Sequence, residues 1–121
     1  MLYKATILLV DDEPDILDVL NDTLEPEGYR CLLAGSAEQG LAILEHTPVD
    51  LVLSDLQMPG MDGITFLKLV AQRFPDTVRM ILSGYGERDE VTEAIKQGYT
   101  HAYFRKPWDT ELLLSALGSA L

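Results

Sequence analysis

Short runs of aliphatic and aromatic residues recur along the chain and alternate with longer segments in which apolar residues recur every three or four positions. The short runs have the length and composition of β-strands. They lie at Thr6–Val10, Arg30–Ala34, Leu51–Ser54, Val78–Ser83 and Ala102–Arg105. The longer segments have the spacing of one helix face. The pattern therefore predicts five strands, each followed by a helix.

Four of the predicted helices show a clear apolar stripe. The stripes are formed by Ile16, Leu17, Leu20 and Leu24; by Ile64, Leu67, Ala71 and Phe74; by Val91, Ala94 and Ile95; and by Leu112, Leu113, Ala116, Leu117 and Ala120. The second helix is marked by Ser36 with Gln39, a capping-box pattern. Pro14 suits the first turn of the first helix, Gly98 ends the fourth, and Asp109 is a candidate N-cap of the fifth.

Strict alternation of strands and helices predicts a parallel sheet, because parallel strands need helical crossover connections. Ile7–Val10 and Leu51–Leu53 are continuous apolar runs, as in strands that are covered by helices on both faces. A length of 121 residues suits a single hydrophobic core. We therefore predict one doubly wound α/β domain over residues 1–121, with no second domain in this chain.

The charge balance narrows the classes of partner. The chain has 20 acidic and 9 basic side chains, a net charge of −11. Such a domain is a poor direct ligand for nucleic acid, whose affinity comes largely from Lys and Arg, and for an anionic membrane. Cys31 is the only cysteine, which favours a reducing compartment and a small core residue. With no signal peptide or membrane-spanning run in the sequence, we predict a cytoplasmic domain.

Polar side chains gather where the predicted strands end. In open parallel sheets, ligands bind beyond the carboxyl ends of the strands. The residues at these ends are Asp11, Asp12, Asp55, Ser83 and Lys106. Any one of them could be an ordinary capping or loop residue. All of them at one edge of the sheet favour a shared site.

Three neighbouring carboxylates repel one another, since a like-charge pair at about 4 Å costs on the order of 4 kcal/mol at an effective dielectric near 20. Lys106 alone does not neutralise them, so a proton or a divalent cation is expected. Oxygen ligands suit Mg²⁺ or Mn²⁺. A zinc site is disfavoured because His46 and His101 are isolated and Cys31 lies on another strand, and both histidines are expected to be surface or loop residues.

Four segments carry a resemblance to a known family. They are Ile7–Glu13, Leu53–Gly63, Leu82–Gly84 and Phe104–Pro107. With these segments in this order, the chain resembles the receiver domain of two-component response regulators, the CheY-like family. The resemblance implies a flavodoxin-like sheet with strand order 2-1-3-4-5, and a phosphoacceptor signalling domain rather than an enzyme.

The resemblance also implies a role for each acidic residue. Asp55 would accept a phosphoryl group from a phosphohistidine of a sensor kinase. Asp12, Asp55 and the backbone carbonyl of Gln57 would bind Mg²⁺. Asp11 would act through a metal-bound water and would orient Lys106, which with the metal would stabilise the phosphoryl oxygens.

Further residues would transmit the signal or set its lifetime. Ser83 would hydrogen-bond the phosphoryl group, and Tyr103 would alternate between outward and inward rotamers. A cis peptide bond before Pro107 would be typical of the family. Gln57 and Tyr85 would influence how water reaches the phosphoryl group. The surface of the fourth helix, fifth strand and fifth helix would then change shape for a partner.

Partners and rival functions follow from the same residues. The resemblance implies a sensor histidine kinase or phosphotransfer protein, an output domain or effector protein, and possible homodimerisation through that surface. A haloacid-dehalogenase-type phosphatase would need an Asp where Gln57 stands, and in a flavodoxin Asp11–Glu13 would repel the phosphate. The main alternative is a pseudo-receiver that binds proteins without being phosphorylated. Trp108, where Phe is commoner, is best interpreted as a hydrophobic anchor.

Overall fold

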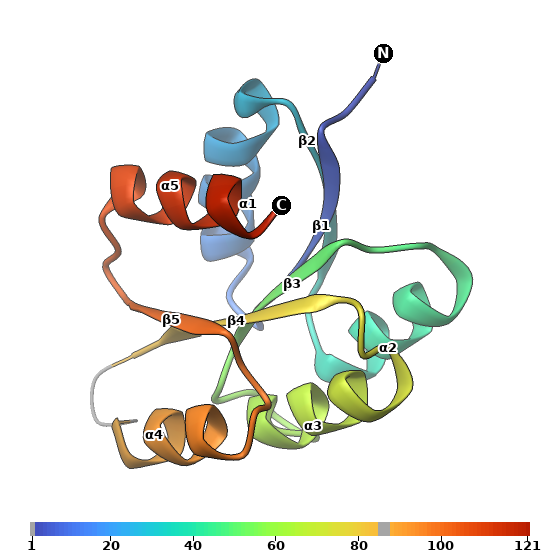
Figure 1. The fold of residues 1–121 in the computed structure, drawn as a ribbon, viewed down its shortest axis with the longest axis vertical. Helices are drawn as coiled ribbons and strands as arrows, with labels where there is room; N and C mark the ends of the chain where they lie inside the picture. Colours follow the sequence, from blue (N-terminus) through green and yellow to red (C-terminus); the bar gives the residue numbers. More distant parts are fainter. Residues whose placement is uncertain (1, 85–87) are drawn as a thin grey trace.

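The structure is a computed structural model that describes residues 2–84 and 88–121. Helices and strands alternate along it (Figure 1). The strands are β1 (Ala5–Val10), β2 (Tyr29–Ala34), β3 (Leu51–Asp55), β4 (Val78–Ser83) and β5 (Ala102–Arg105). The α-helices are α1 (Pro14–Leu24), α2 (Ala37–His46), α3 (Gly63–Arg73), α4 (Arg88–Lys96) and α5 (Thr110–Ala120). A short 3₁₀ helix, η1 (Glu25–Glu27), follows α1 and was not predicted.

The five strands form one parallel sheet in the order β2-β1-β3-β4-β5, which confirms the predicted fold class and topology. The central strands β1, β3 and β4 are buried almost throughout, as their continuous apolar sequences indicated. The strand limits differ from the prediction by at most one residue: β1, β2 and β3 each gain one. The added residue of β3 is Asp55, so this carboxylate belongs to the sheet itself.

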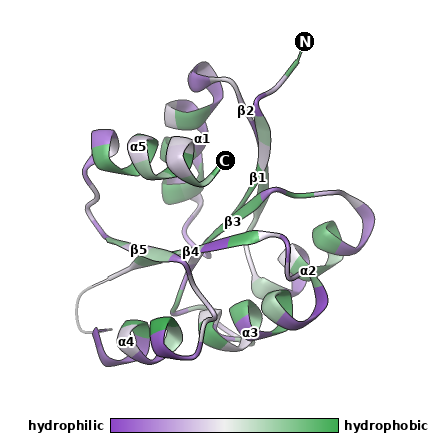
Figure 2. Cartoon of the chain, in the orientation of Figure 1, coloured by the Kyte–Doolittle hydropathy of each residue, from purple (hydrophilic) through white to green (hydrophobic). Residues whose placement is uncertain are grey.

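Two helical layers cover the sheet, with α1 and α5 on one face and α2, α3 and α4 on the other (Figure 1). Each layer has its own core of mainly aliphatic residues. Coloured by hydropathy, the strands and one side of the helices are mostly hydrophobic (Figure 2). Leu17, Leu20, Leu113 and Leu117 build the α1–α5 core. Burial of this apolar surface is the dominant favourable contribution to folding.

Three of the predicted helix stripes need correction. In α3, the fully buried residues are Phe66, Leu67 and Val70, whereas Ile64, Ala71 and Phe74 are only half-buried. The sequence contains two overlapping apolar stripes; Phe66 and Val70 are buried under the sheet, while Ile64 and Phe74 pack at the margin of the same core. Likewise, Ile95 of α4 and Leu112 and Ala120 of α5 are exposed, because the apolar residues of these helices extend beyond the face that meets the sheet; Leu112 is 64% exposed.

The predicted helix starts are confirmed. Pro14 is the first residue of α1, and Ser36 Oγ accepts a hydrogen bond from the Gln39 N–H at 3.1 Å. Gln39 Oε1 in turn accepts from the N–H of Gly35, one residue before the position of an ordinary capping box. Asp109 caps α5 by accepting from the Leu112 N–H.

Other expectations concern Cys31 and the two histidines. Cys31 is half-buried against the α1–α5 core, and burial followed by the charge of Glu25 raises the pKa of its thiol to about 11. It is therefore a small core residue, as predicted. His46 and His101 are exposed, also as predicted. Among the described helices, none is long and apolar enough to cross a membrane.

Candidate functional site

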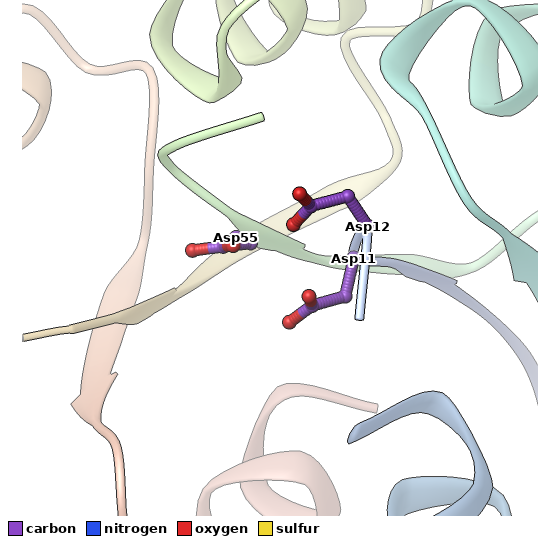
Figure 3. Close-up of side chains that lie close together, drawn as sticks. All are labelled: Asp11, Asp12 and Asp55. Atoms are coloured by element: carbon purple, nitrogen blue, oxygen red, sulfur yellow. The ribbon is translucent and has the colours of Figure 1, made fainter. Parts of the chain in front are cut away.

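Sheet register brings the acidic residues together at the carboxyl edge. Val10 of β1 pairs with Ser54 of β3, so the residues that follow them, Asp11 and Asp55, emerge side by side. Asp12 follows directly on the β1 side. The carboxylates of Asp11, Asp12 and Asp55 each offer an oxygen, and these oxygens all lie within 4.8 Å of one another (Figure 3). The predicted clustering of the three acids is present.

Lys106 enters the same cluster from the end of β5. Its Nζ lies 2.8 Å from Asp11 Oδ2 and 3.3 Å from Asp55 Oδ2. Its backbone N–H donates to the carbonyl of Ser83 at 2.9 Å, and this hydrogen bond links the start of the β5–α5 loop to the end of β4. The Lys106–Pro107 peptide bond is cis, as the family resemblance implied. One ammonium therefore bridges two buried carboxylates.

The other oxygens of these two carboxylates are held by backbone N–H groups. Asp55 Oδ1 accepts from the N–H of Leu56 at 2.8 Å, and Asp11 Oδ1 accepts from the N–H of Glu13 at 2.9 Å. Each carboxylate thus has one oxygen fixed by its own loop and one facing Lys106. Asp12, in contrast, is exposed at the mouth of the cluster. The acidic cluster therefore has two fixed, buried carboxylates and one carboxylate that is open to solvent.

The electrostatic balance of the site is unfavourable for a fully ionised Asp55. Asp55 is 5% exposed, and burial raises the pKa of its carboxyl; the charge of Asp11 adds to this rise, while Lys106 opposes it. Burial by itself would lower the pKa of Lys106, but the hydrogen bond to Asp11 and the charges of Asp55 and Asp11 raise it. The ammonium of Lys106 faces a cluster of three acids, and an all-oxygen donor set of this kind fits a hard divalent cation such as Mg²⁺.

The start of α3 is packed directly against the backbone of Asp55. A Cβ on Gly63 would lie 2.6 Å from Leu56 Cα and closer still to the carbonyl oxygen of Asp55. The Gly63 N–H donates to the carbonyl of Leu56 at 2.8 Å. Only glycine allows this approach, so Gly63 fixes how the loop after Asp55 turns into α3.

The family model described as the response regulator receiver domain matches residues 7–118. The chain belongs to this family. Receiver domains are phosphoacceptor signalling domains rather than classical enzymes, and this one carries the acidic pocket of Asp11, Asp12 and Asp55 together with Lys106.

Curated relatives of this receiver domain are longer proteins. The hydrogenase transcriptional regulatory protein HoxA of Cupriavidus necator is 36% identical over 118 residues, which is 98% of this chain and 24% of the relative. The transcriptional regulatory protein GlrR of Escherichia coli is 37% identical over 97% of this chain and 26% of its own length. The chain thus spans about a quarter of the length of these relatives.

A solved structure supports the same assignment. The signal receiver domain of an HD domain-containing protein from Pseudomonas fluorescens Pf-5 has 40% sequence identity and a TM-score of 0.91, and the match covers 96% of this chain and 93% of that one.

The structure describes all but one of the remaining residues that were predicted to matter for function. Ser83 is buried at the end of β4, and Tyr103 is 47% exposed on β5, in an outward position. The side chain of Gln57 is exposed in the loop after Asp55. Tyr85 lies outside the described residues. Trp108 is half-buried in the α1–α5 core, two residues before α5, as expected for a hydrophobic anchor.

Two charged residues were not predicted to matter: Glu13 lies beside the pocket, and Arg79 lies near the start of β4. Glu13 Oε1 lies 3.9 Å from Lys106 Nζ, and only its place next to Asp12 could have indicated this. Arg79 is buried in β4. A charged residue inside the apolar run of a strand covered on both faces is a usable signal, because such a strand offers no solvated side for it.

Proposed function

We propose that this receiver domain is a phosphorylation-controlled switch in which Asp55 accepts a phosphoryl group from the phosphohistidine of a sensor kinase or phosphotransfer protein. The observation that carries the proposal is a buried carboxylate with one oxygen anchored by the Leu56 N–H and the other facing Lys106 at 3.3 Å. A carboxylate held in this way is positioned to act as a nucleophile.

The transfer forms a bond between a carboxylate oxygen of Asp55 and phosphorus, and it breaks the phosphorus–nitrogen bond of the donor. The electron pair of that bond leaves with the imidazole of the donor, which takes up a proton. Lys106 is near enough to Asp55 to stabilise charge on the phosphoryl oxygens. Lys106 would exchange part of its interaction with Asp11 for one with the phosphoryl group, and the buried Ser83 would supply a hydroxyl.

A divalent cation, Mg²⁺ or Mn²⁺, is the cofactor that fits the donor set. Asp12 and Asp55 would hold it directly, with the backbone carbonyl of Gln57 as a third protein ligand, and Asp11 would contact it through water. When bound, such a cation neutralises charge that Lys106 leaves uncompensated and stabilises the phosphoryl oxygens. The all-oxygen, acid-rich pocket supports this proposal.

The response is a population shift between two arrangements of the face formed by α4, β5 and α5. Phosphorylation adds roughly −1.5 to −2 charge to an already acidic pocket. Ser83 and Lys106 would move towards the phosphoryl group, and Tyr103 would turn from its exposed position to the inside. Gln57 and Tyr85 would set how water reaches the phosphoryl group.

Partners follow from the family and remain proposals for this chain. The donor is a histidine kinase or phosphotransfer protein in the cytoplasm. The output is a domain or effector protein contacted through the α4–β5–α5 face, and the same face could form a homodimer. The relatives named above include two transcriptional regulators and an HD domain-containing protein, so the kind of output is left open. The receiver domain itself is not proposed to bind nucleic acid.

The test is phosphorylation by acetyl phosphate with Mg²⁺, measured by intact-protein mass spectrometry. We expect a single added phosphoryl group in the wild-type protein, none without a divalent cation, and none in Asp55→Asn. Asp76→Asn is the matched control, because Asp76 is an exposed acid far from the pocket in sequence and lies in the loop before β4.

Stoichiometric labelling of Asp55→Asn would contradict the assignment of the phosphoacceptor. Beryllofluoride with Mg²⁺ mimics the aspartyl phosphate, so it distinguishes a receiver that is phosphorylated from a pseudo-receiver that is not. A receiver that uses Asp55 should show shifted amide resonances at Leu56 and a higher melting temperature. A folded wild-type protein without either response would favour the pseudo-receiver.

A further inference from the structure

Arg79 is a buried cation at the opposite edge of the sheet from the acidic pocket. It is 6% exposed, and burial lowers the pKa of its guanidinium. The hydrogen bonds of this guanidinium that the structure describes all go to backbone carbonyls. The acceptors are Tyr99 at 3.0 Å, Thr77 at 2.9 Å, and Pro75 and Gly98 at 3.4 Å each.

These carbonyls come from two different connections. Pro75 and Thr77 lie between α3 and β4, and Gly98 and Tyr99 lie between α4 and β5. The guanidinium therefore sits where the carboxyl ends of α3 and α4 meet. Helix carboxyl ends carry partial negative charge, and this explains how a buried cation is stabilised by carbonyls alone. Its planar fork suits several acceptors at once.

The backbone of Arg79 reinforces the same junction. Its N–H donates to His101 Nδ1 at 3.0 Å, and its carbonyl accepts from the His101 N–H at 2.7 Å. Thr100 Oγ1 lies 3.2 Å from that carbonyl. The last turn of α4 is closed by the Tyr99 N–H, which donates to Ala94, with Gly98 at φ +78°. The residues that follow α4 are thus held against the start of β4 by both the side chain and the backbone of Arg79.

The two ends of α4 have different surroundings. The helix follows β4, whose end at Ser83 borders the pocket, and runs back towards the start of β4, where Arg79 lies (Figure 1). We infer that Arg79 is a positioning residue that holds the carboxyl end of α4 in place, so that the response to phosphorylation is a displacement of its amino end about this fixed point. The inference rests on the proposed function, because it specifies which part of the α4–β5–α5 face moves.

The test is amide hydrogen exchange, residue by residue, in the whole protein with Mg²⁺, with and without beryllofluoride. In the wild-type protein we expect altered exchange over residues 88–91 and less than a twofold change at Tyr99 and His101. In Arg79→Lys the charge remains, but the fork to several carbonyls is lost. Exchange at Tyr99 and His101 should then rise at least about tenfold without beryllofluoride, and the beryllofluoride response should spread to both amides.

Arg73→Lys is the matched control, because Arg73 ends α3 with an exposed guanidinium paired to Glu45. It should leave both patterns unchanged. A wild-type response at Tyr99 and His101 as large as that over residues 88–91 would overturn the inference, and this measurement needs no variant. It would also be overturned if Arg79→Lys merely lowered global stability and kept the wild-type response pattern.

The two proposals can fail separately. A folded wild-type protein with no beryllofluoride response at Leu56 would overturn the proposed function, and with it a moving amino end of α4. The comparison of Arg79→Lys with the wild type in the absence of beryllofluoride would still decide whether Arg79 anchors the carboxyl end. Unchanged exchange at Tyr99 and His101 in that comparison would overturn the anchor itself.

Discussion

Buried charges are compensated in opposite ways at the two ends of the strands. At the amino end of the strands, called the amino edge here, the buried guanidinium of Arg79 donates hydrogen bonds to four backbone carbonyls. At the carboxyl edge, Asp11 and Asp55 share the single ammonium of Lys106 at 2.8 and 3.3 Å. The first edge has more acceptors than its charge requires, and the second has more negative charge than its cation balances.

This difference teaches where the molecule can change state. A buried charge whose hydrogen bonds are all made, such as Arg79, holds in place the segments that supply its acceptors. An unbalanced pocket gains from any added cation and from a rearrangement of Lys106, so we expect it to respond to the proposed chemistry at Asp55. Functional sites often retain such locally unfavourable arrangements, which other parts of the fold offset.

The largest expected effect comes from breaking the carboxyl edge at Gly63. Gly63→Ala places a Cβ against the backbone of Asp55 and Leu56, and neither can move without displacing β3. We expect the free energy of unfolding to fall by about 3 kcal/mol, measured by urea denaturation. Gly118→Ala is the control: nothing lies within 4 Å of its Cβ, and the change should stabilise α5 by roughly 0.5–1 kcal/mol. Equal effects at the two glycines would contradict the close approach.

Breaking the amino edge should have a smaller effect. Arg79→Met fills a similar space but leaves the four carbonyls without their donor. Because hydrogen bonds to charged groups contribute about 1.5–3 kcal/mol and the freed carbonyls can reach water, we expect a loss of about 2 kcal/mol in urea denaturation. Arg73→Met removes an exposed ion pair with Glu45 and the contact of the guanidinium with the Phe74 ring, and it should change stability by less than about 1 kcal/mol. A neutral Arg79→Met would show that the guanidinium contributes nothing net.

The smallest effect has the opposite sign. The pKa of Asp55 is raised in the folded protein, so the native state holds this proton more tightly than the unfolded chain. Its ionisation therefore lowers stability as the pH rises above the ordinary value of 3.8. We expect Asp55→Asn to be more stable than the wild type by about 1 kcal/mol at pH 7 without a divalent cation.

The pH dependence gives this prediction its control. The difference between Asp55→Asn and the wild type should shrink as the pH falls below 3.8, because the Asp55 carboxyl is then increasingly protonated in both the folded and the unfolded protein. Asp76→Asn, which changes an exposed acid in the loop before β4, is the control. Thermal unfolding at several pH values measures both. A less stable Asp55→Asn at pH 7 would mean that the ion pair with Lys106 outweighs burial.

The strand pattern was sufficient to predict a parallel sheet and the gathering of acids at its carboxyl edge, whereas the strand order came from the family resemblance. Continuous apolar runs identify strands covered on both faces, and the residues after them must then meet at the carboxyl edge. Asp11, Asp12, Asp55 and Lys106 could be found in this way because the rule depends only on chain order and parallel pairing.

Other features depend on how elements pack, which the sequence pattern does not specify. The choice of Phe66 and Val70 over Ile64 and Ala71 in α3 depends on which of two apolar stripes meets the sheet. The partners of Arg79 are carbonyls of two distant connections, and carbonyls are present at every residue. Gly63 stands in a motif that was noted, but its necessity appears only when α3 is placed against Asp55.

Trp108 links this chemistry to an optical signal. It is the only tryptophan of the chain, it is half-buried in the α1–α5 core, and it stands two residues after Lys106. Indole emission depends on the polarity and the charges around the ring. The indole emission of the unmodified protein therefore comes from one position, two residues along the chain from Lys106, and it offers a dye-free way to test in real time for the proposed cation binding and phosphorylation.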